Sequence, residues 1–88
     1  MKLLWTAAAW EEYLYWQRSD PAVLKRINDI IRDSMRSPFA GLGKPEPLKA
    51  GLKGCWSRRI TAEHRLVYRL TGPAEDQRLE ILQCRYHY

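Results

Sequence analysis

Apolar residues in the first 40 positions recur with the spacing of two amphipathic helices. The first helix is predicted to begin after Thr6, whose hydroxyl suits an N-cap, and to carry a stripe of large apolar side chains facing the core. The stripe consists of Trp10, Tyr13, Leu14 and Trp16. The second helix is predicted to begin at Asp20-Pro21, a cap followed by a first-turn proline, and to end at Ser37-Pro38. Its apolar positions are Leu24, Ile27, Ile31 and Met35.

The remaining segments have the residue types and turn signals of short strands. Residues 2–5 form a predicted first strand, and residues 56–60, 66–70 and 78–86 form three more after the helices. Residues 39–54 hold four glycines and two prolines and are predicted to be a loop. The order βααβββ predicts an α+β fold, with two N-terminal helices packed on one face of a mainly antiparallel sheet. The other face of the sheet is then free for a ligand.

The length of 88 residues, with 45% hydrophobic composition, predicts a single domain over residues 1–88 with a modest core. There is neither a charged-then-apolar secretory leader nor an apolar run near the ~20 residues that cross a bilayer, which predicts a cytoplasmic protein without a membrane partner. Cys55 and Cys84 are then expected to be reduced. No Cys-x-x-Cys or His-x-x-x-His pair arranges metal ligands, so no metal and no cofactor are predicted.

Positive charge is concentrated in one part of the chain. The protein has 15 Lys and Arg against 10 Asp and Glu, a net charge of +5. Residues 49–69 contain one acid, Glu63, and six basic residues, which are Lys49, Lys53, Arg58, Arg59, Arg65 and Arg69. Such a run can be an ordinary solvated face, but the planar fork of arginine suits bidentate contacts with phosphate. The charge therefore predicts a polyanionic partner, with nucleic acid as the leading class.

Two further features carry candidate chemistry. Glu46 lies between Pro45 and Pro47, which restrict the backbone on both sides and should hold its carboxylate in a narrow set of orientations. The sequence ends at residues 85–88 with an arginine, a histidine and two tyrosines. A terminal cluster of this kind is often a frayed, solvated tail, but it can also deliver titratable and stacking groups to a site.

Together these groups match the requirements of RNA cleavage. Attack by a 2′-OH on the adjacent phosphate needs a base, cations that hold the phosphate, and an acid for the leaving 5′-oxygen. Glu46 is the predicted base because free carboxyl groups are ionised at neutral pH, and His87 is the predicted acid because free imidazole titrates near neutrality. The predicted phosphate-binding residues are Arg65, Arg59, Arg58 and Lys49, and Tyr86 and Tyr88 are predicted to stack on bases.

Several motifs resemble those of the YoeB (Txe) toxins of the RelE superfamily, and the resemblance covers nearly the whole chain. The motifs are YLYWQ (residues 13–17), GKPEPLK (43–49), WSRRI (56–60), HRLVY (64–68) and CRYHY (84–88). The resemblance implies the RelE-like microbial RNase fold and a bacterial type II toxin that enters the ribosomal A site. There it would cleave mRNA without metal, leaving a 2′,3′-cyclic phosphate, and a YefM-type antitoxin would neutralise it.

The resemblance also implies roles for individual residues. It places the base at Glu46, the acid at His87 and a terminal tyrosine at Tyr88. The phosphate-binding groups that it implies are Lys49, Arg59 and Arg65. Two departures from the family pattern are a longer segment at residues 71–77 and the small residue Cys55, and neither touches a proposed catalytic position. Whether the toxin alone is a monomer or a homodimer is left open.

Two alternatives from other classes of function remain at this point. In a non-catalytic RNA-binding translation regulator, the same cations would hold phosphate while Glu46 and His87 played no chemical part. In a protein-interaction module, the tryptophans and tyrosines would form an interface instead. Release of a shortened RNA would exclude the first alternative, and loss of RNA binding at moderate salt would favour the second.

Overall fold

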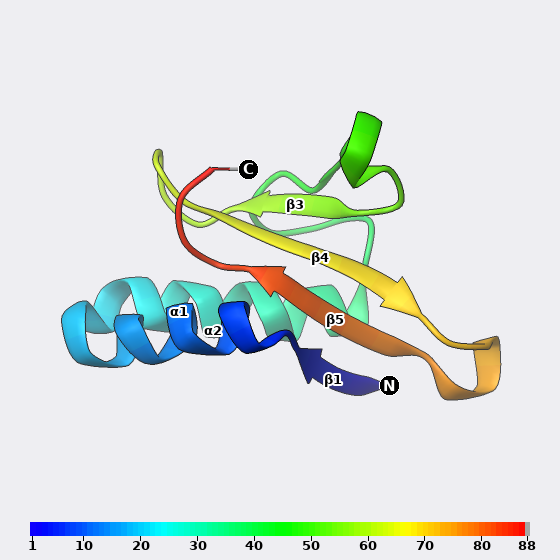
Figure 1. Ribbon diagram of the computed structural model, residues 1–88, viewed down its shortest axis with the longest axis horizontal. Helices are drawn as coiled ribbons and strands as arrows, with labels where there is room; N and C mark the ends of the chain where they lie inside the picture. The colour runs from blue at the N-terminus through cyan, green and yellow to red at the C-terminus, as the bar shows by residue number, and fades with distance from the viewer. Residues whose placement is uncertain (88) are drawn as a thin grey trace.

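A computed structural model of the protein describes residues 1–87, which form a five-stranded sheet with two α-helices on one face (Figure 1). The elements are β1 (Lys2–Trp5), α1 (Ala7–Ser19), α2 (Pro21–Arg36), β2 (Glu46–Pro47), β3 (Trp56–Arg59), β4 (Arg65–Thr71) and β5 (Arg78–Gln83). Two short 3₁₀ turns, Ala50–Leu52 and Ala74–Asp76, lie in the connections. The predicted α+β class is confirmed.

Side-chain caps begin both helices where the sequence predicts them. The hydroxyl of Thr6 accepts a hydrogen bond from the Ala9 amide, and the carboxylate of Asp20 accepts from the amides of Ala22 and Val23. The backbone amide of Asp20 also donates to the Trp16 carbonyl, the last turn of α1. Because Asp20 ends one helix and begins the next, the two helices form a tight hairpin. Neither helix in residues 1–87 is long and apolar enough to cross a membrane.

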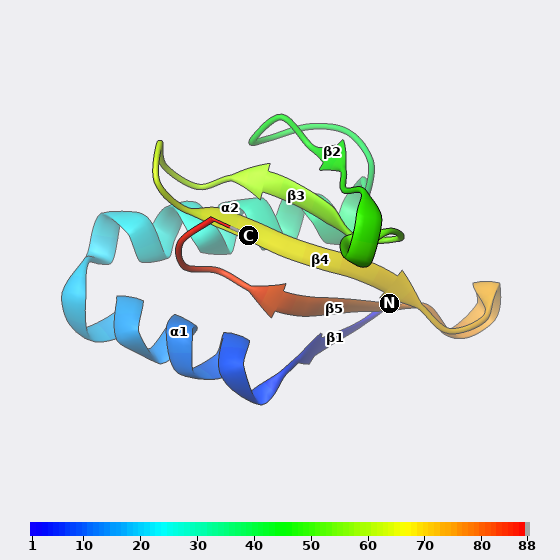
Figure 2. The same cartoon turned by 45° about the horizontal axis from the view of Figure 1, so that its top comes forward.

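The strand order in the sheet is β1-β5-β4-β3-β2 (Figure 2). β1 runs parallel to β5, and the other pairs are antiparallel, as expected for a mainly antiparallel sheet. Two predictions are wrong in detail. Residues 39–54 are not all loop, because β2 lies within them and pairs with β3, and β5 ends at Gln83 instead of residue 86. A two-residue strand rich in proline has no periodic sequence pattern that could reveal it.

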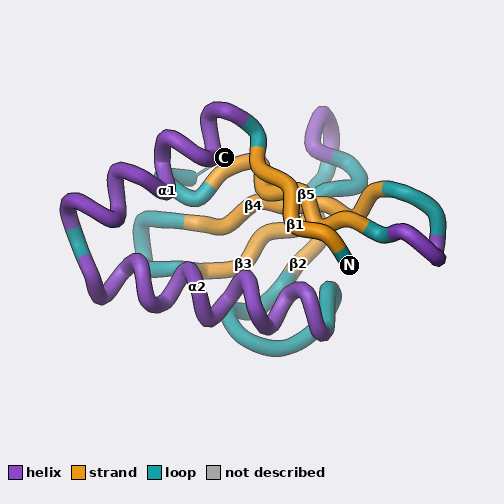
Figure 3. Tube along the Cα trace, turned by 90° about the horizontal axis from the view of Figure 1, so that it is seen from below, coloured by secondary structure: helices purple, strands orange, loops and turns teal. Residues whose placement is uncertain are grey.

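The two helices form a layer on one face of the sheet (Figure 3), and the main core lies between these layers. Residues from both layers with no exposed surface include Ala9, Ile27, Ile30, Leu66, Tyr68, Leu79 and Ile81. The predicted stripe on α1 is only partly core: Trp16 is buried, but Trp10 is 43% exposed and packs against Trp5 and Tyr13 at the edge. The buried face of α1 is centred on Ala9 and Trp16, which are seven residues and hence about two turns apart.

Candidate active site

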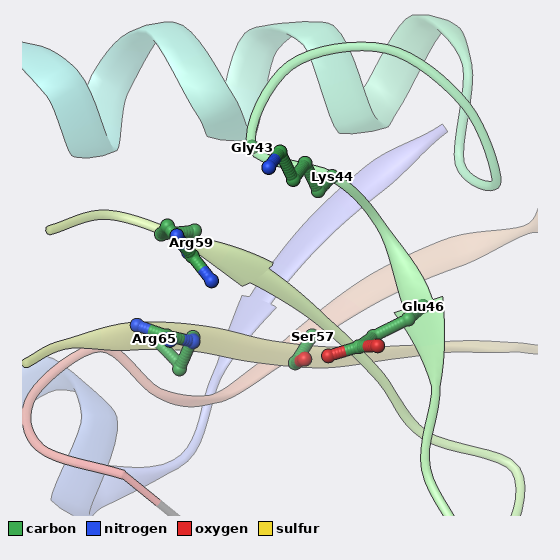
Figure 4. A pocket seen from close by; sticks show the side chains of 6 residues that line it. All are labelled: Gly43, Lys44, Glu46, Ser57, Arg59 and Arg65. Atoms are coloured by element: carbon green, nitrogen blue, oxygen red, sulfur yellow. The ribbon is translucent and has the colours of Figure 1, made fainter. Parts of the chain in front are cut away.

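The strand register brings four of the polar residues to one face of the sheet. Glu46 on β2 is paired with Ser57 on β3, and Arg59 on β3 is paired with Arg65 on β4. Ser57 and Arg59 lie two residues apart, so they face the same way, opposite to the helices. With Gly43 and Lys44 these side chains line an open pocket of about 90 Å³ (Figure 4).

Glu46 extends from β2 toward Ser57 across the pocket (Figure 4). The residue is exposed, and within residues 1–87 no lysine or arginine forms an ion pair with its carboxylate. Its strand position is fixed by pairing with β3 and by the Leu48 amide, which donates to the Cys55 carbonyl at 2.9 Å. The carboxylate is therefore held near the arginines without being neutralised by them, which leaves it able to accept a proton.

Arg65 is nearly buried, and one of its terminal nitrogens is fully occupied by the connection between β3 and β4. Nη1 donates to the carbonyls of Thr61, Ala62 and His64 at 2.7, 3.3 and 3.0 Å. These contacts fix the plane of the guanidinium. Its other N–H donors have no partner within residues 1–87, and the side chain lines the pocket, so it can hold an anion there.

The segment that follows β5 returns to the end of the sheet where β3 and β4 are connected (Figure 1). The Tyr86 carbonyl accepts a hydrogen bond from the Arg65 amide at 3.1 Å. Nε2 of the exposed His87 lies 3.4 Å from the Ala62 carbonyl, which also accepts from the Arg65 guanidinium. His87 is thus brought beside Arg65, and the segment up to His87 is tied to the fold. Tyr86 is 58% exposed, while Tyr88 lies outside the described residues.

The surroundings of Arg58 contradict the prediction that this residue binds RNA phosphate. Its side chain is fully buried on the helix side of β3, where Nη1 forms an ion pair with Asp33 at 2.8 Å. Nε donates to the Tyr68 hydroxyl at 2.9 Å. The remaining acceptors are the carbonyls of Ser37, Ala40 and Leu42. All five N–H donors of a guanidinium are therefore used within the protein, so Arg58 organises the 37–42 loop instead of contacting a ligand.

Another predicted binding residue lies outside the pocket, and two side chains that line it were not predicted. Lys49 does not line the pocket, whereas Lys44, which the sequence did not single out, does. The carbonyl of Gly43 accepts from the Arg59 amide at 2.6 Å, and a Cβ at Gly43, where φ is +78°, would lie 2.9 Å from the Arg59 carbonyl oxygen. Glycine is needed for this close approach, which holds Lys44 next to the arginines. Ser57 was missed as well, because a serine within a strand carries no separate signal.

The other reactive side chains lie away from this pocket. Burial, with a smaller effect of Glu12, raises the pKa of the Cys84 thiol to about 12, so the group stays protonated at neutral pH. Cys55 is also buried, and both cysteines are free. Residues 1–87 contain no cluster of three or more His, Cys, Asp or Glu side chains that could hold a metal ion. The pocket thus combines a free carboxylate, two arginines and a lysine, with an imidazole beside it.

The arrangement of two helices on a five-stranded sheet is a fold that RelE-like toxins share. The same fold is found in the solved structure of YafQ from Escherichia coli, which superposes with a TM-score of 0.71 at 18% identity over 98% of this chain and 92% of that one. More specifically, the chain belongs to the YoeB-like toxins of bacterial type II toxin-antitoxin systems, whose family model matches residues 5–88. The resemblance inferred from the sequence motifs is confirmed.

Individual relatives are similar along their whole length. Toxin YoeB from Escherichia coli O6:H1 is 58% identical over 100% of both chains. A YoeB/ParE toxin structure from Agrobacterium tumefaciens is 60% identical, with a TM-score of 0.95 over 100% of both chains. YoeB from Staphylococcus aureus, 39% identical over 100% of this chain and 98% of that one, has been solved as a dimer and in a heterotetrameric YoeB-YefM complex, with TM-scores of 0.88 and 0.87.

Proposed function

We propose that this toxin is a ribosome-dependent, metal-independent mRNA endoribonuclease that acts in the cytoplasm, cleaving mRNA in the ribosomal A site and so blocking translation. The observation that carries the proposal is one pocket that joins the carboxylate of Glu46 to the guanidinium groups of Arg59 and Arg65. The position of His87 beside Arg65 supplies the fourth group that such a reaction needs.

In the proposed reaction, Glu46 takes the proton from the 2′-OH, whose oxygen then attacks the adjacent phosphorus. Arg65 and Arg59 hold the phosphate oxygens, on which negative charge increases in the transition state. His87 donates a proton to the 5′-oxygen as its bond to phosphorus breaks. The products are a 2′,3′-cyclic phosphate and a free 5′-OH, with Lys44 and Lys49 adding positive charge. Tyr86 and Tyr88 would stack on neighbouring bases.

The small size and the openness of the site support the proposed dependence on ribosomes. A pocket of about 90 Å³ can hold a phosphate group but offers little surface to orient the flanking nucleotides. Correct alignment of the 2′-oxygen, phosphorus and leaving oxygen is worth several orders of magnitude in rate. A second surface, that of ribosomal RNA around the A site, would supply this alignment, and the net charge of +5 would favour docking there.

We expect cleavage of mRNA on translating ribosomes and little cleavage of the same RNA in free solution. Mapping of mRNA 5′ ends, with and without the toxin, measures both, and EDTA is added under conditions that leave the ribosomes intact. Cleavage should persist in EDTA. Equal cutting of naked RNA, or its abolition by EDTA, would show that the proposal is wrong. Ribosome binding without shortened RNA would instead favour a non-catalytic translation regulator.

A YefM-type antitoxin is the proposed protein partner, and a homodimer is a second possible assembly. The support is the YoeB-YefM complex and the YoeB dimer solved for the Staphylococcus aureus protein. An acidic antitoxin segment could bind the arginines that would otherwise hold phosphate and could displace the terminal residues. We expect an excess of such an antitoxin to stop cleavage and to change hydrogen exchange in residues 85–88. Full activity in the saturated complex would contradict this.

A further inference from the structure

The position of His87 depends on how the chain leaves the sheet after β5. The pairing of β4 with β5 shifts between Val67 and Tyr68, which leaves Leu82 as an additional residue on β5. Cys84 is then fully buried against α1, where its carbonyl accepts from the Trp16 indole at 2.9 Å and its amide donates to Glu12 at 2.8 Å. This anchor fixes the start of the segment Cys84–His87, but it lies three residues before His87.

The bend that aims His87 is at Tyr86, whose φ of 65° is in the left-handed region. A tyrosine rarely adopts this conformation unless its surroundings hold it. Here the Tyr86 amide donates to Nδ1 of His64 at 2.7 Å, and the Tyr86 carbonyl accepts from the Arg65 amide and from the side chain of Gln83. Within residues 1–87, Nδ1 of His64 is the only side-chain atom that accepts a hydrogen bond from the Tyr86 amide.

His64 is itself held rigidly at the end of the β3–β4 connection. Its ring packs edge-on against Trp16, with ring centres 4.8 Å apart, and contacts the Tyr86 ring at 5.7 Å. Its amide donates to the Thr61 hydroxyl, and its carbonyl accepts from Arg65. Since Nδ1 accepts the Tyr86 amide, the proton of the neutral ring lies on Nε2. The imidazole thus presents a fixed lone pair to the bend.

We propose that His64 is a positioning residue that holds the left-handed bend at Tyr86 and thereby places His87 beside Arg65. The proposal deepens the function proposed above and rests on it, because it assigns to His64 the placement of the proposed acid. His64 does not line the pocket, so its imidazole would act on the site through the terminal segment. A second, independent contact limits the effect of losing it: the Arg85 guanidinium lies 3.5 Å from the centre of the Tyr15 ring and 4.6 Å from that of Tyr86.

Two substitutions separate the hydrogen bond from the packing of the ring. His64→Phe keeps an aromatic ring against Trp16 and Tyr86 but has no acceptor. His64→Asn loses the ring but places its Oδ1 as many bonds from Cα as Nδ1 is. We expect His64→Phe to lower single-turnover cleavage on ribosomes by about 10- to 100-fold, as a small misplacement of a reacting group does, with ribosome affinity unchanged. His64→Asn should stay within about threefold of the parent, although it is the less well packed variant.

Nuclear magnetic resonance of the purified proteins provides a readout that does not depend on activity. In His64→Phe the Tyr86 amide should exchange with solvent faster and the His87 ring signals should shift, whereas His64→Asn should retain the parent values. If both variants cleave like the parent, or if His64→Asn loses as much activity as His64→Phe, the inference is wrong. If the parent itself does not cleave ribosome-bound mRNA, the proposed function fails, and the Tyr86 and His87 signals then decide whether His64 positions the segment.

Discussion

Substituting glutamine for Glu46 or for His87 is expected to reduce cleavage of ribosome-bound mRNA by about 10²- to 10⁴-fold, the usual contribution of one general acid or base. Glutamine is close to each side chain in size and can still form hydrogen bonds, but at neutral pH it cannot take up or release the proton. Both residues are exposed, so folding should be unaffected. Single-turnover cleavage and ribosome binding, measured side by side, would show a loss of rate without a comparable loss of affinity.

Glu75→Gln is the matched control for Glu46→Gln, because it removes another exposed carboxylate, from the 3₁₀ turn before β5 and outside the pocket. It should cleave at the parent rate. If Glu46→Gln and His87→Gln also cleave within about threefold of the parent, the assigned roles are incorrect, because the loss would lie far below the expected range. Loss of activity in only one of them would leave the base or the acid to be found elsewhere.

The largest effect on stability is expected from Arg58→Met. Methionine fills a similar volume but leaves the Asp33 carboxylate and the carbonyls of the 37–42 loop without their buried donor. Breaking a buried ion pair from one side costs about 3–5 kcal/mol, a large part of the stability of a small domain. Thermal and urea unfolding would measure this loss. A variant with parent stability would show that the buried network contributes little.

Arg36→Met is the control for that prediction, because Arg36 pairs with the same Asp33 from the surface, where its side chain is 81% exposed. Its loss should cost no more than about 1 kcal/mol. The stabilities of the two variants should also differ in how they depend on pH. The Leu42 amide, and next the Arg58 guanidinium, hold the pKa of Asp33 below its usual value. The resulting stabilisation is present at neutral pH and is lost as the pH falls through that lowered pKa, and Arg58→Met should show less of this loss.

The sequence by itself determined the helices and the fold class, because the signals involved are local. Thr6 and Asp20-Pro21 mark the beginning of each helix by chemistry that acts within one turn, and the structure has both caps where the sequence predicts them. The longer strands were found for the same reason. β2 was missed because Glu46 and Pro47 become a strand only by pairing with β3.

The sequence also indicated a candidate site, since the motif around Glu46, the basic residues of segment 49–69 and the histidine and tyrosines of residues 85–88 could be recognised directly. Only the tertiary structure decided which of these residues lie together. Arg58 and Arg59 are neighbours of the same type, yet side chains alternate along a strand, so one is buried on Asp33 and the other lines the pocket. Likewise His64 contacts Tyr86 from 22 residues away. Such contacts depend on strand register and on chain reversal, which involve residues distant in the sequence and leave no local pattern.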